Sequence, residues 1–254
     1  MNFNTRIIDN PSALPAAEKA RLMDQFIHVC AKASSFGVNE QESITNWTHV
    51  WHAIADLGIY AKIVCVEDEQ RNVIGFATAK HLEINGKPVF MGQLSYTLPE
   101  YQGQKLTGNA LQQLLGPEDI PKFIGGYIVA ATPNPAVYEG VNKMTGALAQ
   151  HYNLNSTVYP QIDASGQALT IPAHIVAVAE RAITVMDAEA SLDRENFILG
   201  NLFQHHGKVY SSYNFKCKTE HVRKFFEENI SPERHDVVMM VVSLEEKQTL
   251  QAAA

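Results

Sequence analysis

The stretch that decides the fold is GQLSYTLPEYQGQKLTGNALQQLLGP, residues 92–117. An apolar run typical of a β-strand leads into Pro99, and a short polar loop containing Gly103 follows it. The leucines beyond the loop recur at helical spacing until Gly116 and Pro117 end the run, which predicts a helix of about ten residues. The stretch therefore predicts a strand that feeds a helix through a tight loop.

The same loop is a candidate anion site. The first amide N–H groups of a helix have no partner within the helix, and the helix dipole gives that end a partial positive charge. A strand that feeds such an end through a glycine aims these amides at a phosphate or a pyrophosphate. The alternative is an ordinary connection in which Gly103 only makes the turn, and the loop alone leaves both interpretations open.

The residues on either side of this stretch predict more of the sheet. Residues 61–98 predict three antiparallel strands, because apolar runs are separated by a polar turn and by Asn85-Gly86, a strong hairpin signal. Residues 123–131 predict a strand parallel to 89–98, since a strand, a helix and a strand imply a right-handed crossover. Asn134 then suits the cap of another helix, with proline at its first position.

The two ends of the chain add helices and a final strand. Apolar residues at helical spacing predict helices at 15–35 and 43–58. Two further segments, 171–188 and 219–230, also predict helices, and the apolar run at 235–244 predicts a strand that rejoins the sheet. The helical material between 170 and 230 is then an insertion that builds the acceptor side of a site or an oligomer contact.

The composition is that of an acidic protein with a sizeable core. With 46% hydrophobic residues, a net charge of -7 and a pI near 5.8, the chain lacks the basic balance of nonspecific nucleic-acid binding. The N-terminus lacks a charged-then-apolar leader, the apolar helix at 171–188 carries charged residues, and the three cysteines are scattered. We therefore expect a cytoplasmic protein with neither a nucleic-acid nor a membrane partner.

Two histidine pairs raise the question of a metal site. His49 and His52 lie three residues apart on a predicted helix, and His205 and His206 are adjacent. Neither pair has a third ligand at a readable spacing, so packing against aromatic faces is the better interpretation of the helical pair. We expect no metal.

The order of elements around the loop resembles the GNAT superfamily, whose members move an acyl group from coenzyme A. The resemblance covers roughly residues 60–150, and it is carried by Thr97, Pro99, Glu100, Tyr101, Gln102, Gly103 and Asn134, with the leucine-rich helix behind the loop. It implies an α/β fold with a GNAT-like mixed, mostly antiparallel sheet flanked by helices. It also implies a single domain over 1–254, with its core at about 60–150, an insertion or extension at 160–235 and a terminal strand at 236–244.

The resemblance implies acetyl-coenzyme A as the acyl-donor substrate, with its pyrophosphate on residues 102–109. The family loop usually carries glycine where this chain has Lys105 and Thr107, and the Lys105 ammonium could reach a phosphate or its bulk could crowd the backbone. The residues implied in binding are Tyr96, Thr97, Gln102, Gly103, Gln104, Lys105, Leu106, Thr107, Gly108, Asn109 and Asn134.

Three residues are candidates for proton transfer. Many family members carry a tyrosine acid where this chain has Val141, and the nearest phenol is Tyr138. The alternative for Tyr138 is a structural role, in which the ring packs and the hydroxyl lies on the surface. Glu83 and Glu100 could accept a proton or hold a water, and solvated carboxylates at turns are the alternative for both.

The resemblance implies direct transfer of an acetyl or other acyl group to an unidentified amine acceptor. A homo-oligomer is a possible partner state. One alternative is a non-catalytic acyl-coenzyme A-binding or scaffold protein with the same fold, which the valine at position 141 keeps open. Another is an α/β protein that binds a different phosphorylated ligand at the same loop.

Overall fold

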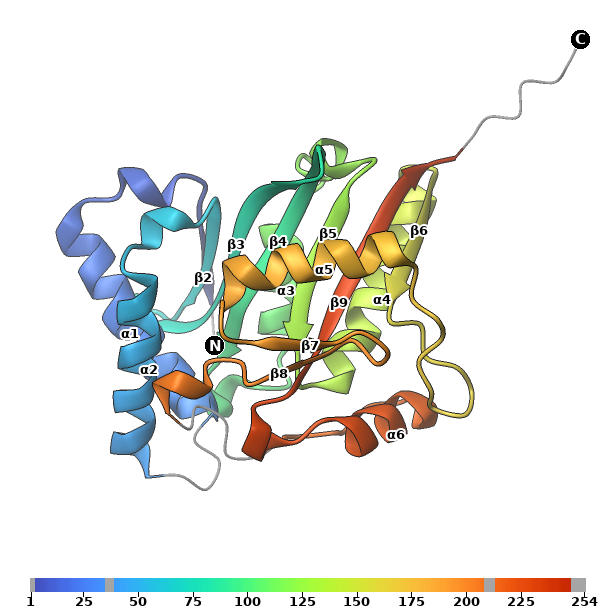
Figure 1. The fold of residues 1–254 in the computed structure, drawn as a ribbon. Helices are drawn as coiled ribbons and strands as arrows, with labels where there is room; N and C mark the ends of the chain where they lie inside the picture. The colour runs from blue at the N-terminus through green and yellow to red at the C-terminus, as the bar shows by residue number, and fades with distance from the viewer. Residues whose placement is uncertain (1–2, 35–38, 208–212, 248–254) are drawn as a thin grey trace, which may run out of the picture.

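The computed structural model describes residues 3–34, 39–207 and 213–247, and its centre is one nine-stranded mixed sheet (Figure 1). The strands follow the order β1-β2-β3-β4-β5-β9-β8-β7, and β6 also pairs with β9. Their bounds are β1 Asn4–Ile8, β2 Lys62–Glu67, β3 Val73–Ile84, β4 Lys87–Thr97, β5 Tyr127–Thr132, β6 Leu154–Tyr159, β7 Ser191–Asp193, β8 Ile198–Gly200 and β9 Val237–Glu246. The expected mixed, mostly antiparallel sheet flanked by helices is confirmed.

The three antiparallel strands expected before the loop are β2, β3 and β4. The turn between β3 and β4 has Asn85 at φ 54° and Gly86 at φ 73°. Two positive φ values in sequence are what a two-residue hairpin turn requires, which explains the strength of the Asn-Gly signal.

Strands β4 and β5 are parallel, as expected, and their pairing is short. Only Val89–Met91 pairs with Tyr127–Val129, although β4 continues to Thr97 and β5 to Thr132. The register of β3 against β4 also shifts between Ala77 and Ala79, a β-bulge that bends β4. The two strands therefore diverge towards their carboxyl ends.

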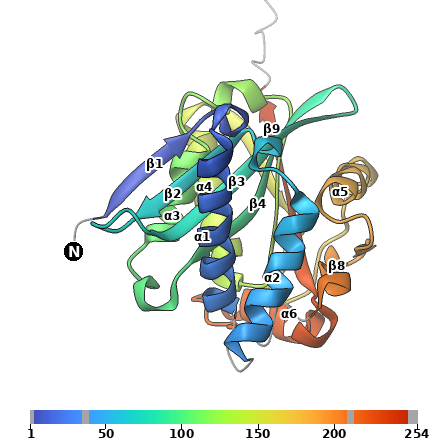
Figure 2. The same cartoon turned by 90° about the vertical axis from the view of Figure 1, so that its left-hand side faces the viewer.

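Helices cover both faces of the sheet (Figures 1 and 2). α5 packs on the face that carries Met91, Val129 and Met239, whereas α3 and α4 lie behind the sheet in the view of Figure 1. α1 packs on β3, where the ring of Phe26 stacks on Phe76 with centroids 4.1 Å apart. The bounds are α1 Ala16–Ser34, α2 Glu40–Ile54, α3 Leu106–Leu114, α4 Pro135–His151, α5 Ala173–Met186 and α6 Glu220–Asn229.

The expected helix at 43–58 is wrong at both of its ends. α2 begins at Glu40, because the Asn39 side chain accepts from the amide of Gln41 and caps the helix. Ser43 lies inside the helix, and its hydroxyl donates to the carbonyl of Ala31 on α1. The helix ends at Ile54 rather than at the following glycine.

The sequence did not reveal every strand. β9 is almost wholly buried and lies inside the sheet, as its apolar run predicted, but β1, β6, β7 and β8 were not expected. These four are short or carry exposed polar residues, so their alternation is weak. Among the described residues, no helix is both long enough and apolar enough to span a bilayer.

Candidate functional site

The loop between β4 and α3 carries two left-handed residues. Gly103 has φ +81°, and Lys105, which caps α3, has φ +62°. Only glycine adopts this backbone region without strain. Lys105 therefore has a backbone conformation that favours glycine, although its side chain is a lysine. No side chain caps the start of α3.

The backbone amides of residues 103–108 form a continuous unpaired row. Within the part of the chain that the structure describes, none of these six amides donates to an acceptor, and the first pairing after them runs from Asn109 to the Lys105 carbonyl. A Cβ placed on Gly103 or Gly108 would meet nothing within 4 Å. The row lies at the positive end of a helix, and Gly103, Gln104, Lys105 and Gly108 in it are exposed, an arrangement that suits phosphate binding.

Side chains hold the loop in place without covering this row. The hydroxyls of Thr97 and Thr107 lie 2.7 Å apart and tie the end of β4 to the first turn of α3. The Gln102 side-chain amide donates to the Thr97 carbonyl at 3.4 Å, and the Tyr101 ring meets Phe3 edge-on with centroids 5.7 Å apart. Gln104 and Asn109, also expected to bind, are exposed beside these amides.

Beside this loop, β4 and β5 continue beyond the last residues at which they pair with each other. A Cβ on Gly92 would sit 3.8 Å from the Ala130 methyl group, one residue past the last pair of the two strands, Met91 with Val129. From Gly92 to Thr97, no strand of the described residues pairs with β4 on the β5 side. Ser95 lies on this stretch, and its buried hydroxyl has no hydrogen-bond partner among the described residues.

Sequence reasoning missed Ser95 and Gly92. The bulge in β4 breaks the period of two on which assignment of faces depends, so the pattern alone did not show which residues lie on this stretch of β4. The separated "GxxS" spacing is also too common to have served as a motif.

Asn134 caps α4, as expected, and faces the same end of the sheet. Its side-chain oxygen accepts from the Ala136 amide at 2.9 Å, and its own backbone amide donates to the Thr132 hydroxyl at 3.1 Å. The junction between β5 and α4 is therefore closed by the chain's own side chains. Only the NH₂ group of Asn134 has no acceptor among the described residues.

Tyr138 is buried one turn after this cap. Its hydroxyl donates to the carbonyl of Pro160 at 2.6 Å, and its ring meets Phe226 of α6 with centroids 6.1 Å apart. Burial raises the pKa of this phenol above its usual value. The hydroxyl thus has a structural partner, and it is not on the surface as the packing alternative had placed it.

Glu83 and Glu100 do not converge. Glu83 is exposed near the β3–β4 turn and lies opposite Pro88. Pro88 precedes Thr97 along β4 by nine residues, which at the rise of a strand is about 30 Å. Glu100 is exposed at that far end, beside the loop. These two carboxylates therefore cannot act on the same atom.

The histidines form no metal centre in the described residues. No group of three or more His, Cys, Asp or Glu side chains there could hold a metal ion. His49 and His52 are exposed on α2. His205 lies 3.8 Å from Asp187 and 3.5 Å from Glu189, so its neighbours are carboxylates at ion-pair distance.

No protein-family model and no curated protein matches the chain. Several solved structures do align with it. Diaminobutyrate acetyltransferase from Paenibacillus lautus, solved with L-2,4-diaminobutyric acid and coenzyme A, aligns over 64% of this chain and 85% of its own, at 13% identity and a TM-score of 0.39. A GNAT family N-acetyltransferase from Escherichia coli with coenzyme A aligns over 60% and 68%, at 15% identity and a TM-score of 0.35.

A third aligned structure is an acetyltransferase of the GNAT family from Staphylococcus aureus. It covers 65% of this chain and 94% of its own, at 9% identity and a TM-score of 0.34. The ligands and activities named for these structures are properties of those proteins.

Proposed function

We propose that this chain binds an acyl-coenzyme A and transfers its acetyl or other acyl group directly to an amine, which attacks the thioester. The observation that carries the proposal is the row of six amides at 103–108, which have no partner among the described residues and follow the end of β4 that β5 does not pair with. A diphosphate suits the row, and an extended, amide-containing arm suits an open strand edge.

The two parts of this site suit different parts of one ligand. The amides at the start of α3 would hold the diphosphate, and the Lys105 ammonium adds a charge beside them. The unpaired edge of β4 between Gly92 and Thr97 offers backbone groups to the pantetheine arm.

The transfer needs little from side chains once the two substrates are held together. The amine nitrogen attacks the thioester carbonyl carbon, the C–S bond breaks, and the nitrogen proton passes through water to the departing thiolate. Holding the amine at near-attack distance supplies much of the rate acceleration. Tyr138 is not needed as the acid, because its proton is held by the Pro160 carbonyl.

Two measurements test the proposal. Calorimetry with coenzyme A tests binding, and a chromogenic thiol assay with acetyl-coenzyme A tests transfer to a diamine, an amino acid, an amino sugar and a peptide N-terminus. Cys30 and Cys65 are buried, so the protein contributes a small thiol background that a sample without acceptor measures. We expect binding and acceptor-dependent thiol release. Absence of binding at millimolar coenzyme A contradicts the proposal.

The non-catalytic binder stays a second candidate on one specific observation. The place of the family acid is Val141, and the nearby Tyr138 hydroxyl is engaged by Pro160. Binding of acetyl-coenzyme A without thiol release for any amine in the panel favours this candidate. A thermal-shift comparison of coenzyme A with nucleotides tests the remaining alternative, another phosphorylated ligand.

A further inference from the structure

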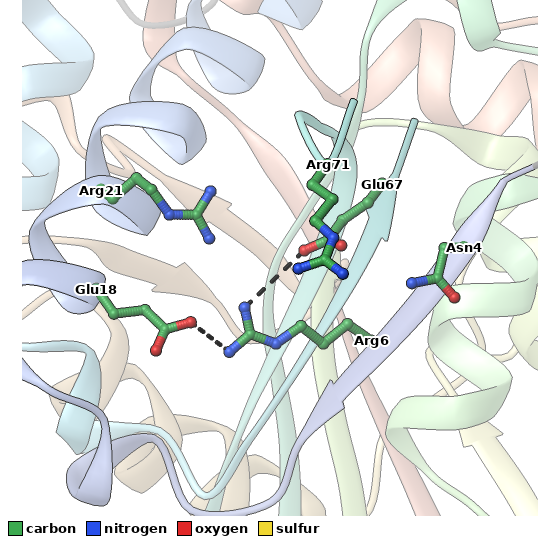
Figure 3. Close-up of a pocket in the computed structure, with 6 residues that line it drawn as sticks. All are labelled: Asn4, Arg6, Glu18, Arg21, Glu67 and Arg71. Carbon is green, nitrogen blue, oxygen red and sulfur yellow. Dashed lines mark hydrogen bonds and ion pairs between the residues drawn. The ribbon is translucent and has the colours of Figure 1, made fainter. Parts of the chain in front are cut away.

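A separate cavity of about 590 Å³ lies between β1, the first turns of α1 and the β2–β3 turn (Figure 3). All of its lining residues are polar or charged, and none of them belongs to the loop at 103–108. It is lined by Asn4, Arg6, Glu18, Arg21, Glu67 and Arg71. Three guanidinium groups from three different elements therefore share one space with two carboxylates.

Two of the three arginines have no carboxylate partner. Arg6 is hydrogen-bonded to Glu18 and lies 4.0 Å from Glu67. Arg21 donates to the uncharged Gln25 side chain at 3.0 Å, and among the described residues neither Arg21 nor Arg71 has a carboxylate within ion-pair distance. Figure 3 shows both side chains directed towards the space above Arg6. Two uncompensated positive charges thus face the cavity.

Glu67 is a buried carboxylate with spare capacity to accept. Its side chain is only 5% exposed, its one ion pair is the 4.0 Å contact with Arg6, and within the described chain it accepts no hydrogen bond. A buried charge is costly unless donors surround it. A ligand that brings a charged donor next to Glu67 would supply the interaction that the chain itself does not.

The walls of the cavity are held in place before any ligand arrives. The Asp68 carboxylate accepts from the amides of Gln70 and Asn72 and from the Asn72 side chain, which fixes the turn that presents Arg71. β1 pairs with β2 over its whole length, Asn4–Ile8. Fixed walls reduce the entropy that a ligand would otherwise lose in ordering them.

We propose that this cavity binds a small zwitterion, with its oxyanion between Arg21 and Arg71 and its amino group on Glu67. A phosphate or carboxylate can accept from both guanidinium forks at once, and an ammonium group beside it satisfies the carboxylate. Arg6 stays paired with Glu18 and orients Glu67. The site is independent of the acyl-coenzyme A proposal.

Calorimetry with two matched probes tests the site. Ethyl phosphate carries the oxyanion alone, and phosphoethanolamine adds an amino group to the same skeleton. Both are titrated at constant ionic strength into the wild type and into Arg21→Gln, Arg71→Gln and Glu67→Gln. Arg181→Gln on α5 is the control, because Arg181 is exposed and has no ion pair among the described residues.

The expected pattern has opposite signs for the two kinds of variant. Replacement of Arg21 or Arg71 weakens the binding of both probes about tenfold, whereas Arg181→Gln leaves both affinities unchanged. Glu67→Gln strengthens the binding of ethyl phosphate, because a repulsive charge is removed. The same variant abolishes the preference for phosphoethanolamine over ethyl phosphate. Phosphate bound by the amides at 103–108 would not respond to these changes.

Equal affinities in the wild type and both arginine variants overturn the proposal. A preference for phosphoethanolamine over ethyl phosphate that is as large in Glu67→Gln as in the wild type also overturns it. Arg21 and Arg71 are exposed, so their replacement leaves the core intact. If Glu67→Gln does not fold, a crystal of the wild type soaked with phosphoethanolamine decides the matter. Its phosphorus must lie between the two guanidinium groups.

Discussion

Two neighbouring parallel strands feed helices at the same end of the sheet, and the two junctions are built in opposite ways. At the junction of β5 and α4, the Asn134 side chain caps the helix and Pro135 occupies its first position. At the junction of β4 and α3, the cap residue is Lys105 in the left-handed region, and six amides have no partner among the described residues. One junction is closed by its own chain, and the other is open.

The difference shows what an open junction costs and what it makes possible. A side-chain cap stabilises a helix by about 1 kcal/mol, and a left-handed non-glycine residue costs a similar amount. The junction at α3 has neither the cap nor a relaxed backbone, so the fold gives up stability there. The positive end of α3 is left available to an external anion.

The sharpest test places a negative charge at the open junction. Gly108→Glu puts a carboxylate in the first turn of α3, where a Cβ meets nothing within 4 Å. A charge about 8 Å from a bound phosphate costs about 2 kcal/mol at an effective dielectric of about 20, so we expect coenzyme A to bind roughly thirtyfold more weakly by calorimetry.

The matched control is Gly140→Glu. Gly140 is also exposed, also lies in a helix and also has open space at its Cβ position, but it lies in α4. Both variants lose a helical glycine and should gain about 0.5–1 kcal/mol in unfolding free energy. Equal coenzyme A affinity in the two variants would show that the amides of α3 do not hold the diphosphate.

The closed junction is tested next through the tyrosine that follows its cap. Tyr138→Phe leaves the buried Pro160 carbonyl without its donor, so we expect a loss of about 1–3 kcal/mol in unfolding free energy by urea denaturation. The rate of thiol release should stay the same, because the hydroxyl donates its proton to the Pro160 carbonyl. A large fall in kcat with unchanged stability would instead make Tyr138 the acid.

The difference in unfolding free energy between the wild type and Tyr138→Phe should depend on pH in one direction. Burial raises the pKa of Tyr138 in the folded state, so the native protein holds this proton more tightly than the unfolded chain does. The stabilisation is complete below the unfolded pKa of about 10 and is lost as the pH rises through the folded value. The stability difference between wild type and Tyr138→Phe should therefore shrink above about pH 10.

How much the sequence predicts differs between these junctions. Asn134-Pro135 is a strong local signal because a short polar side chain and a proline act on adjacent backbone, and the structure has that cap as expected. Gly103 indicated the open row at 103–108, but residue propensities do not predict that a lysine adopts the left-handed region. The fate of Tyr138 depended on Pro160 and Phe226, which are distant in sequence.

Removing the cap should make the closed junction resemble the open one. Asn134→Ala deletes the acceptor for the Ala136 amide, and we expect a loss of about 1 kcal/mol in unfolding free energy. Asn134→Ser is the control, since serine can accept the same hydrogen bond. Equal stability of the alanine and serine variants would mean that water satisfies this helix end as well as the side chain does.

The smallest expected effect comes from relaxing the open junction. Lys105→Gly removes the strain of a left-handed side chain, worth about 1–2 kcal/mol, but frees the unfolded chain, so the net gain should be about 0.5 kcal/mol by urea denaturation. Lys105→Ala keeps the strain and should leave stability unchanged. Both variants lose the ammonium and should weaken coenzyme A binding equally and slightly, because an exposed charge contributes about 1 kcal/mol or less. If glycine proves no more stable than alanine, the left-handed cap is not strained, and the openness of this helix end costs the fold only its missing cap.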